Sequence, residues 1–242
     1  MGSFTSLHPV GDMRAANHAA ANANRFSRCH PPCDEPRGPA REHLSGRVDR
    51  QDFLKTLAEA CQKTDWQVHA YCLMRNHFHL VVETPNANLV DGMHWLLSTY
   101  TIRLNRRHET PGHVFSGRYK ALVVESDGGG YLKTVCDYVH LNPVRAHLLG
   151  TQDRLLSYPW SSLGWYLAAK EHRPGWMRVD RLLGEHGIHR NTAAGRMEFE
   201  GRMEARRMQE EELVRQRKNA PEKLAIAARL RSVLPGPGDV GD

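Results

Sequence analysis

Two apolar runs separated by a polar pair are the feature that most constrains the fold of this chain. The runs WQVHAYCLM (66–74) and HFHLVVET (77–84) are rich in β-branched and aromatic residues, and Arg75 and Asn76 stand between them. Strand-like runs joined by so short a polar connection are typical of a β-hairpin. The sequence therefore predicts two adjacent antiparallel strands in the first third of the chain.

Apolar residues on either side of this hairpin recur at intervals of three and four, which is the periodicity of an amphipathic helix. We expect helices over residues 48–63, 88–108 and 131–142, and a further strand over residues 118–125. Pro143 should stop the last of these helices, because the residue before a proline avoids the helical region. The order helix, strand, strand, helix, strand, helix indicates an α+β fold.

The two ends of the chain differ in composition from its middle. Residues 1–46 are rich in Ala, Asn, Pro and Gly without a sustained period, and we expect a disordered N-terminal segment there. Residues 47–167 form the predicted domain, and residues 168–242 form a helical, charged extension. Within this extension, residues 191–223 predict a solvated helix with ion pairs between positions four apart.

Charge and cysteine content narrow the class of protein. The chain has 33 Lys and Arg against 27 Asp and Glu, a net charge of +6 that favours a polyanionic partner. The five cysteines are odd in number and scattered, which does not indicate a disulfide framework. No apolar run reaches the length of about 18 residues that a membrane span needs. We therefore expect a cytoplasmic protein without a membrane partner.

The second predicted strand carries two histidines, His77 and His79, at alternate positions. Successive side chains of a strand point to opposite faces, so these two imidazoles share one face, about 7 Å apart. Such a pair suits two ligands of one divalent ion. The alternative is that each is a hydrogen-bonded core histidine.

The third predicted helix places a phenol and an amide on one face. Tyr138 and Asn142 are four residues apart, so they lie one above the other on a helix. Tyr131 precedes Tyr138 by seven residues on that same face, and geometry alone does not choose between the two tyrosines as a nucleophile. Either tyrosine also fits the rim of a core with its hydroxyl in water.

The segments AYCLMRNHFHLVVETPNANL, NRRHETPGHVFSGRYKALVVE, YLKTVCDYVHLNPVRAHLL and YPWSSL occur in this order between residues 48 and 166. Together they strongly resemble the single-tyrosine HUH transposases, and most closely the REP-associated tyrosine transposases. The resemblance implies a ferredoxin-like antiparallel sheet with helices on one face. It also implies an HUH motif of His77, Phe78 and His79, a nucleophilic Tyr138, and Asn142 as a third metal ligand.

The same resemblance implies an activity. The protein would cleave and rejoin single-stranded, hairpin-bearing DNA through a 5′-phosphotyrosine intermediate, with Mg²⁺ or Mn²⁺ as cofactor, as a monomer or a homodimer. Basic residues near the site are candidates for contacts with DNA phosphates. These candidates are Arg103, Arg106, Arg107, Arg118, Lys120 and Arg145.

The N-terminus departs from the family pattern. Members begin with a strand that lies beside the histidine-bearing strand, and nothing in residues 1–46 matches it. Its absence would leave backbone groups of the sheet unpaired. Two alternatives therefore remain: a degenerate relative that binds hairpin DNA without cleaving it, and, less favoured, an RNA-binding sheet module.

Overall fold

The computed structural model describes residues 24–29, 42–115, 119–124 and 130–218, and every structural statement below concerns these residues. Four strands form a single antiparallel sheet in the order β2, β3, β1, β4. They are β1 (Asn24–Cys29), β2 (Gln67–Leu73), β3 (Phe78–Glu83) and β4 (Lys120–Val124). With one helix after β1 and another after β3, this is the predicted α+β, ferredoxin-like arrangement.

Strand β1 corrects the expectation that residues 1–46 contribute no strand. It pairs with β3 along one edge and with β4 along the other, and Arg28 is the register partner of both His79 and Lys120. The sequence NRFSRC has little of the alternation that marks a strand, so its position depends on pairing with both neighbours rather than on local propensity. Leu44 also departs from the expectation for this segment, because it is fully buried in the core.

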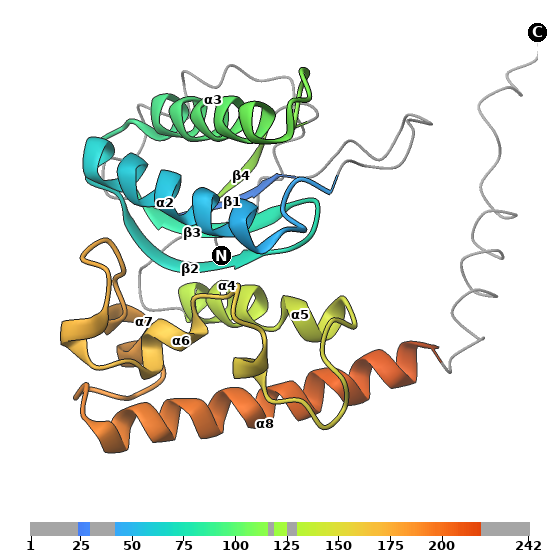
Figure 1. Cartoon of the computed structure of the whole chain (residues 1–242). Helices are drawn as coiled ribbons and strands as arrows, with labels where there is room; N and C mark the ends of the chain where they lie inside the picture. The colour runs from blue at the N-terminus through green and yellow to red at the C-terminus, as the bar shows by residue number, and fades with distance from the viewer. Residues whose placement is uncertain (1–23, 30–41, 116–118, 125–129, 219–242) are drawn as a thin grey trace, which may run out of the picture.

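Helices α2 (Arg47–Thr64) and α3 (Leu89–His108) cover one face of the sheet, as Figure 1 shows. Their bounds agree with the predicted helices to within one residue. The apolar face of α2 reaches the sheet through Phe53, whose ring centre lies 4.7 Å from that of Phe78 and 5.1 Å from that of Tyr100. Phe78 therefore points toward α2 and α3, and its neighbour His79 points toward the opposite face.

That opposite face is covered too, by helices that the predicted ferredoxin-like sheet with helices on one face did not include. Helix α4 (Tyr131–His140) packs on β2, β3 and β4, and α5 (Asn142–Arg145) follows it. Helices α6 (Leu163–Leu167) and α7 (Asp180–Glu185) lie on the same side of the sheet as α4 (Figure 1). The short 3-10 helices η1 (Leu155–Ser157) and η2 (Lys170–His172) precede and follow α6 in the chain. The sheet is thus a layer between two groups of helices.

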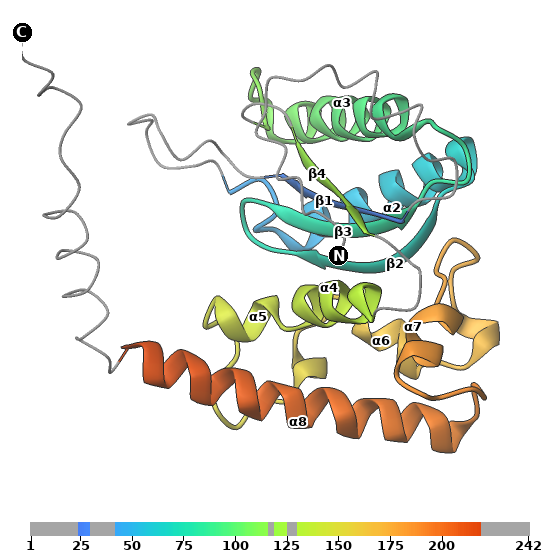
Figure 2. The same ribbon diagram turned by 180° about the vertical axis from the view of Figure 1, so that it is seen from behind.

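The long helix α8 (Ala193–Lys218) runs along the outside of this second group, as Figure 2 shows from behind. Its i, i+4 ion pairs Arg202–Glu198 and Arg207–Glu211 confirm part of the prediction. The expectation of a solvated helix is wrong for one face, because Phe199 and Met203 are buried. Residues 219–223 of the predicted helix lie outside the described residues.

Three of the cysteines, Cys61, Cys72 and Cys136, are buried free thiols. Burial raises the pKa of the Cys61 thiol to about 12, so this group stays protonated at neutral pH. Among the helices that the structure describes, none combines the length and the apolar character needed to cross a membrane.

Candidate active site

The histidine pair lies at the start of β3, on the face that α4 covers. His79 belongs to the strand and is fully buried, whereas His77 directly precedes the strand and is half-buried. Their ring centres are 5.1 Å apart and the ring planes are nearly perpendicular. The predicted sharing of one face is confirmed.

The turn before β3 holds the ring of His77. The backbone amide of Met74 donates to the carbonyl oxygen of His77, which closes the hairpin. The Nδ1 atom of His77 lies 2.9 Å from Oδ1 of Asn76. Because an amide oxygen only accepts hydrogen bonds, Nδ1 is the donor in this contact, and Nε2 is the nitrogen that could bind a metal.

This geometry fits the binding of one divalent ion by both histidines. With metal–nitrogen bonds of about 2.1 Å, the ring centres of two neighbouring imidazole ligands lie about 5 Å apart. The pair of His77 and His79 matches that separation, and the tautomer of His77 presents a nitrogen able to bind a metal. Within the part of the chain that the structure describes, no three His, Cys, Asp and Glu side chains gather into a metal-binding group.

Tyr138 approaches the pair from α4. Leu132, Cys136 and Val139 form the buried face of this helix, and Tyr138 lies beside that face. The ring centre of Tyr138 is 6.0 Å from that of His79, in an edge-to-face arrangement. Tyr131 begins the same helix and is 44 % exposed, about 10 Å along the axis from Tyr138. Of the two tyrosines, the structure brings Tyr138 to the histidines.

Asn142 lies beyond the end of that helix. Helix α4 ends at His140, and Asn142 begins α5, so the two predicted positions do not belong to one continuous helix. The Asn142 side chain is buried, and its Nδ2 atom lies 3.4 Å from the carbonyl oxygen of Val139. This leaves the amide oxygen as the end able to bind a metal, and the ligand role of Asn142 stays a prediction.

Arg145, a predicted contact for DNA, lies next to the candidate nucleophile. Its guanidinium carbon is 4.2 Å from the ring centre of Tyr138. Its Nε and Nη2 atoms donate to the two carboxylate oxygens of Glu210 at 2.7 and 2.9 Å. Burial lowers the pKa of Arg145, but the hydrogen bonds and charge of Glu210, followed by Tyr138, raise it above its ordinary value.

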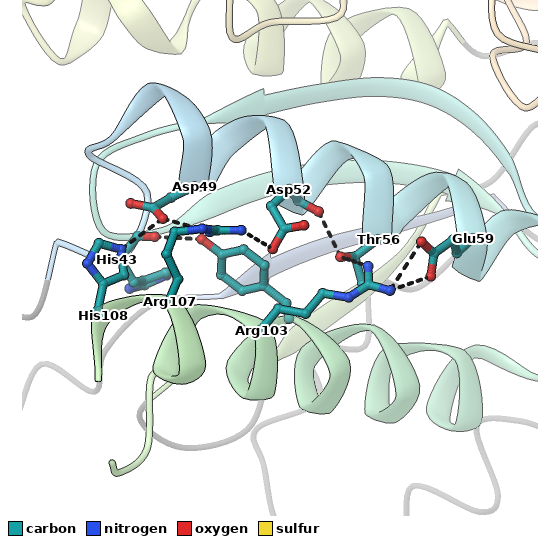
Figure 3. Close-up of polar contacts among 9 residues, drawn as sticks. His43, Asp49, Asp52, Thr56, Glu59, Arg103, Arg107 and His108 are labelled. Carbon is teal, nitrogen blue, oxygen red and sulfur yellow. Dashed lines mark hydrogen bonds and ion pairs between the residues drawn. The ribbon is translucent and has the colours of Figure 1, made fainter. Parts of the chain in front are cut away.

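Two other predicted DNA contacts are bound within the protein, on the opposite side of the sheet. Figure 3 shows Arg103 and Arg107 reaching from α3 to the acidic side chains of α2. Arg103 bonds Thr56 and Glu59. Arg107 lies 3.0 Å from oxygens of both Asp49 and Asp52, and His108 also contacts Asp49. These arginines join two helices and do not lie beside Tyr138.

The three remaining basic candidates are distributed differently. Lys120 is exposed on β4, and it lies on the same face as His79 because both positions are register partners of Arg28. Arg106 is exposed on α3. Arg118 lies outside the described residues. The basic cluster predicted beside the histidines is therefore represented there by Lys120 and Arg145.

The sequence analysis missed the polar residues behind the tyrosine. Asp137 is buried, and its carboxylate lies 3.0 Å from Nε2 of His186 and 2.5 Å from Nη1 of Arg206. Glu210 is 65 residues away from its partner Arg145. No periodicity or spacing in the sequence connects positions so far apart.

The fold and this arrangement define a class: a ferredoxin-like α+β domain in which a buried histidine pair on a central strand faces a tyrosine on the following helix. Residues 39–142 match the family model described as "Transposase IS200 like". The resemblance predicted from the sequence is thus confirmed as a similarity of this segment to IS200-like transposases. His77, His79, Tyr138 and Asn142 all lie within it.

A solved structure described as a REP-associated tyrosine transposase bound to a REP hairpin has the same fold. It is 12 % identical to this chain, with a TM-score of 0.50, and the match covers 73 % of this chain and 91 % of that one. At this identity the likeness concerns the fold alone. Among curated protein sequences, none matches the chain.

Proposed function

We propose that this protein is a transposase that cleaves and rejoins single-stranded, hairpin-bearing DNA, with Tyr138 as its nucleophile. The observation that carries the proposal is the approach of Tyr138 to the buried His79, with ring centres 6.0 Å apart. Its setting in an IS200-like transposase segment indicates phosphoryl transfer rather than another reaction of a tyrosine. The solved relative in complex with a REP hairpin supports a hairpin as the DNA partner.

In the proposed reaction the Tyr138 oxygen attacks the scissile phosphate and loses its proton. A bond forms between that oxygen and phosphorus, and the bond from phosphorus to the 3′ oxygen breaks. The 3′ oxygen takes up a proton and leaves as a free hydroxyl. The 5′-phosphotyrosine bond conserves the energy of the phosphodiester, so rejoining to another 3′ end requires no nucleotide cofactor.

His77 and His79, with the amide oxygen of Asn142, are the residues that would hold Mg²⁺ or Mn²⁺. A divalent ion supplies positive charge to the phosphate oxygens and to the leaving oxygen. Two imidazole ligands favour manganese more than an all-oxygen site does. Lys120, on the same sheet face as His79, would bind a neighbouring phosphate, and so would the Nη1 group of Arg145, which Glu210 does not engage.

The alternative of a hairpin-binding relative without cleavage loses its main support in this structure. That alternative depended on a missing first strand, and β1 now pairs with both β3 and β4. The histidine-bearing strand β3 is therefore paired along both edges, with β1 on one side and β2 on the other.

The test is a covalent-adduct assay. The protein is incubated with Mn²⁺ and a pool of labelled imperfect hairpins with single-stranded flanks, and the products are separated under denaturing conditions. We expect a labelled protein band that disappears in Tyr138→Phe and in His77→Ala. Tyr131→Phe is the matched control, because that tyrosine starts the same helix and is exposed; it should retain the band. Loss of the band in Tyr131→Phe with retention in Tyr138→Phe would overturn the assignment.

A further inference from the structure

Helix α8 contacts the tyrosine-bearing segment through two charged side chains on one of its faces. Arg206 and Glu210 are four residues apart, so they project from the same side of α8. Arg206 binds Asp137, the residue before Tyr138, and Glu210 binds Arg145. The tyrosine is thus bracketed by two contacts to a helix outside the matched family segment, which ends at residue 142.

The contact with Glu210 fixes the orientation of a planar group. Two hydrogen bonds, from Nε and Nη2 of Arg145 to the two oxygens of Glu210, hold one edge of the guanidinium. A bidentate pair of this kind restrains the plane as well as the position of the group. The restrained guanidinium lies over the ring of Tyr138, with its carbon 4.2 Å from the ring centre.

The phenol ring therefore has two fixed neighbours. The imidazole of His79 meets it edge to face, and the guanidinium of Arg145 lies over its face. A change in the ring orientation would disturb both contacts. The Glu210 side chain is 12 % exposed and the Arg145 side chain 31 %, so the pair is partly shielded from water.

We infer that Glu210 is a positioning residue for Tyr138, acting through Arg145 to orient the phenol ring toward the histidine pair. This inference rests on the proposed function. It makes α8 part of the catalytic apparatus, although α8 carries no group that touches DNA or metal in this role. Nucleophile orientation contributes strongly to rate, since a misplacement of about 1 Å costs up to about 100-fold.

The experiment compares Glu210→Gln with Glu200→Gln. Glu200 is a matched control because it also lies on α8 and pairs with an arginine, Arg154, whose side chain is 65 % exposed. Three quantities are measured on the full chain: the rate of adduct formation at saturating hairpin DNA, the dissociation constant for that DNA, and the melting temperature. We expect Glu210→Gln to lower the rate by about 10-fold or more without weakening DNA binding, because only the orientation of the nucleophile changes. Glu200→Gln should match the wild type in rate.

A second variant distinguishes orientation from charge. Arg145→Lys keeps the positive charge but cannot form the two-bond contact with Glu210. It should lower the rate as Glu210→Gln does. If Glu210→Gln instead binds DNA more tightly at an unchanged rate, Glu210 is a competitor of phosphate for Arg145, and the positioning role is wrong.

A spectroscopic measurement makes the inference testable apart from activity. The protein is labelled with 3-fluorotyrosine, and Tyr138→Phe identifies the fluorine signal of Tyr138. Glu210→Gln should shift or broaden this signal, and Glu200→Gln should leave it unchanged. An unchanged signal in Glu210→Gln overturns the inference. A shifted signal in a protein whose wild type forms no adduct overturns the proposed function but leaves the orienting contact in place.

Discussion

Glu83, the last residue of β3, has its carboxylate beside several donors. His69 lies 3.3 Å away, Arg178 2.8 Å and Arg181 3.2 Å. The hydrogen bond from His69, followed by the charges of the two arginines, lowers the pKa of Glu83 to about 2, although burial opposes this. The carboxylate therefore stabilises the folded state as long as it is ionised.

We expect Glu83→Gln to destabilise the protein by about 1–3 kcal/mol at neutral pH. Because the pKa of Glu83 is lower in the folded than in the unfolded state, its contribution is complete above about pH 4.5. It is lost as pH falls toward 2. Urea unfolding of both proteins between pH 2 and 7 checks this, and the two free energies of unfolding should converge at the acidic end. A constant difference across this range would show that the charge of Glu83 is not the cause.

From the burial of His140 we predict a second loss of stability on acidification, in a higher pH range than the loss due to Glu83. Burial lowers the pKa of His140 to about 4, and a nearby Asp137 only partly offsets this. Its Nε2 atom lies 2.8 Å from Oγ of Ser162. The unfolded chain takes up a proton near pH 6.5, but the folded chain does not, so stability falls as pH decreases from about 6.5 to 4. Calorimetry should show a steeper fall of melting temperature in this window for the wild type than for His140→Gln.

At the scale of elements, the ion-pair network between α2 and α3 gives a clear prediction. Arg107→Met removes the shared partner of Asp49 and Asp52 but keeps an apolar stem of similar length. Because the Asp49 side chain is only 8 % exposed, we expect a loss of about 1–3 kcal/mol, more than a surface pair contributes. Arg106→Met, at the adjacent exposed position, is the control and should change the free energy of unfolding little. Equal losses in the two variants would contradict the network's role.

The contact between α3 and Trp66, the residue before β2, depends on a glycine. A Cβ atom at Gly92 would lie 2.2 Å from the ring of Trp66, which is fully buried. We expect Gly92→Ala to destabilise the protein by about 1–3 kcal/mol, despite the higher helix propensity of alanine. Gly201→Ala on α8, where a Cβ meets open space, should stabilise it by about 0.5–1 kcal/mol. Thermal denaturation of both variants checks this: the melting temperature should fall in Gly92→Ala and rise in Gly201→Ala.

The elements differ in how far the sequence alone predicted them. Helices α2, α3 and α4 and strands β2 and β3 follow from strong local periodicity. Tyr138 lies on α4, His79 lies on β3, and His77 directly precedes β3. Strand β1 lacks that periodicity, because a central strand obtains its hydrogen bonds from neighbours distant in sequence. Helix α8 has a charged composition, yet its acidic residues bind groups on other elements. Glu204, for example, accepts a bond from the backbone amide of Leu155.

At the scale of the whole molecule, the sheet separates two sets of charges with different roles. On the side of α2 and α3, arginines are paired with carboxylates and join helices. On the side of α4, the histidine pair, Tyr138 and Lys120 share one face. The net charge of +6 is therefore a poor guide to where the proposed DNA partner would bind, because much of the positive charge is neutralised within the fold.

This separation predicts which basic residues determine the salt dependence of hairpin binding. Each phosphate contact that is lost should reduce the slope of log affinity against log salt concentration by about 0.7–0.9. We expect Lys120→Ala to produce such a reduction, because Lys120 is exposed on the face of His79. Arg103→Ala should leave the slope unchanged, since its guanidinium binds Glu59 on the other side of the sheet. Fluorescence anisotropy of a labelled hairpin at several salt concentrations measures both slopes. A reduced slope in Arg103→Ala with an unchanged slope in Lys120→Ala would place the DNA on the α2 and α3 side instead.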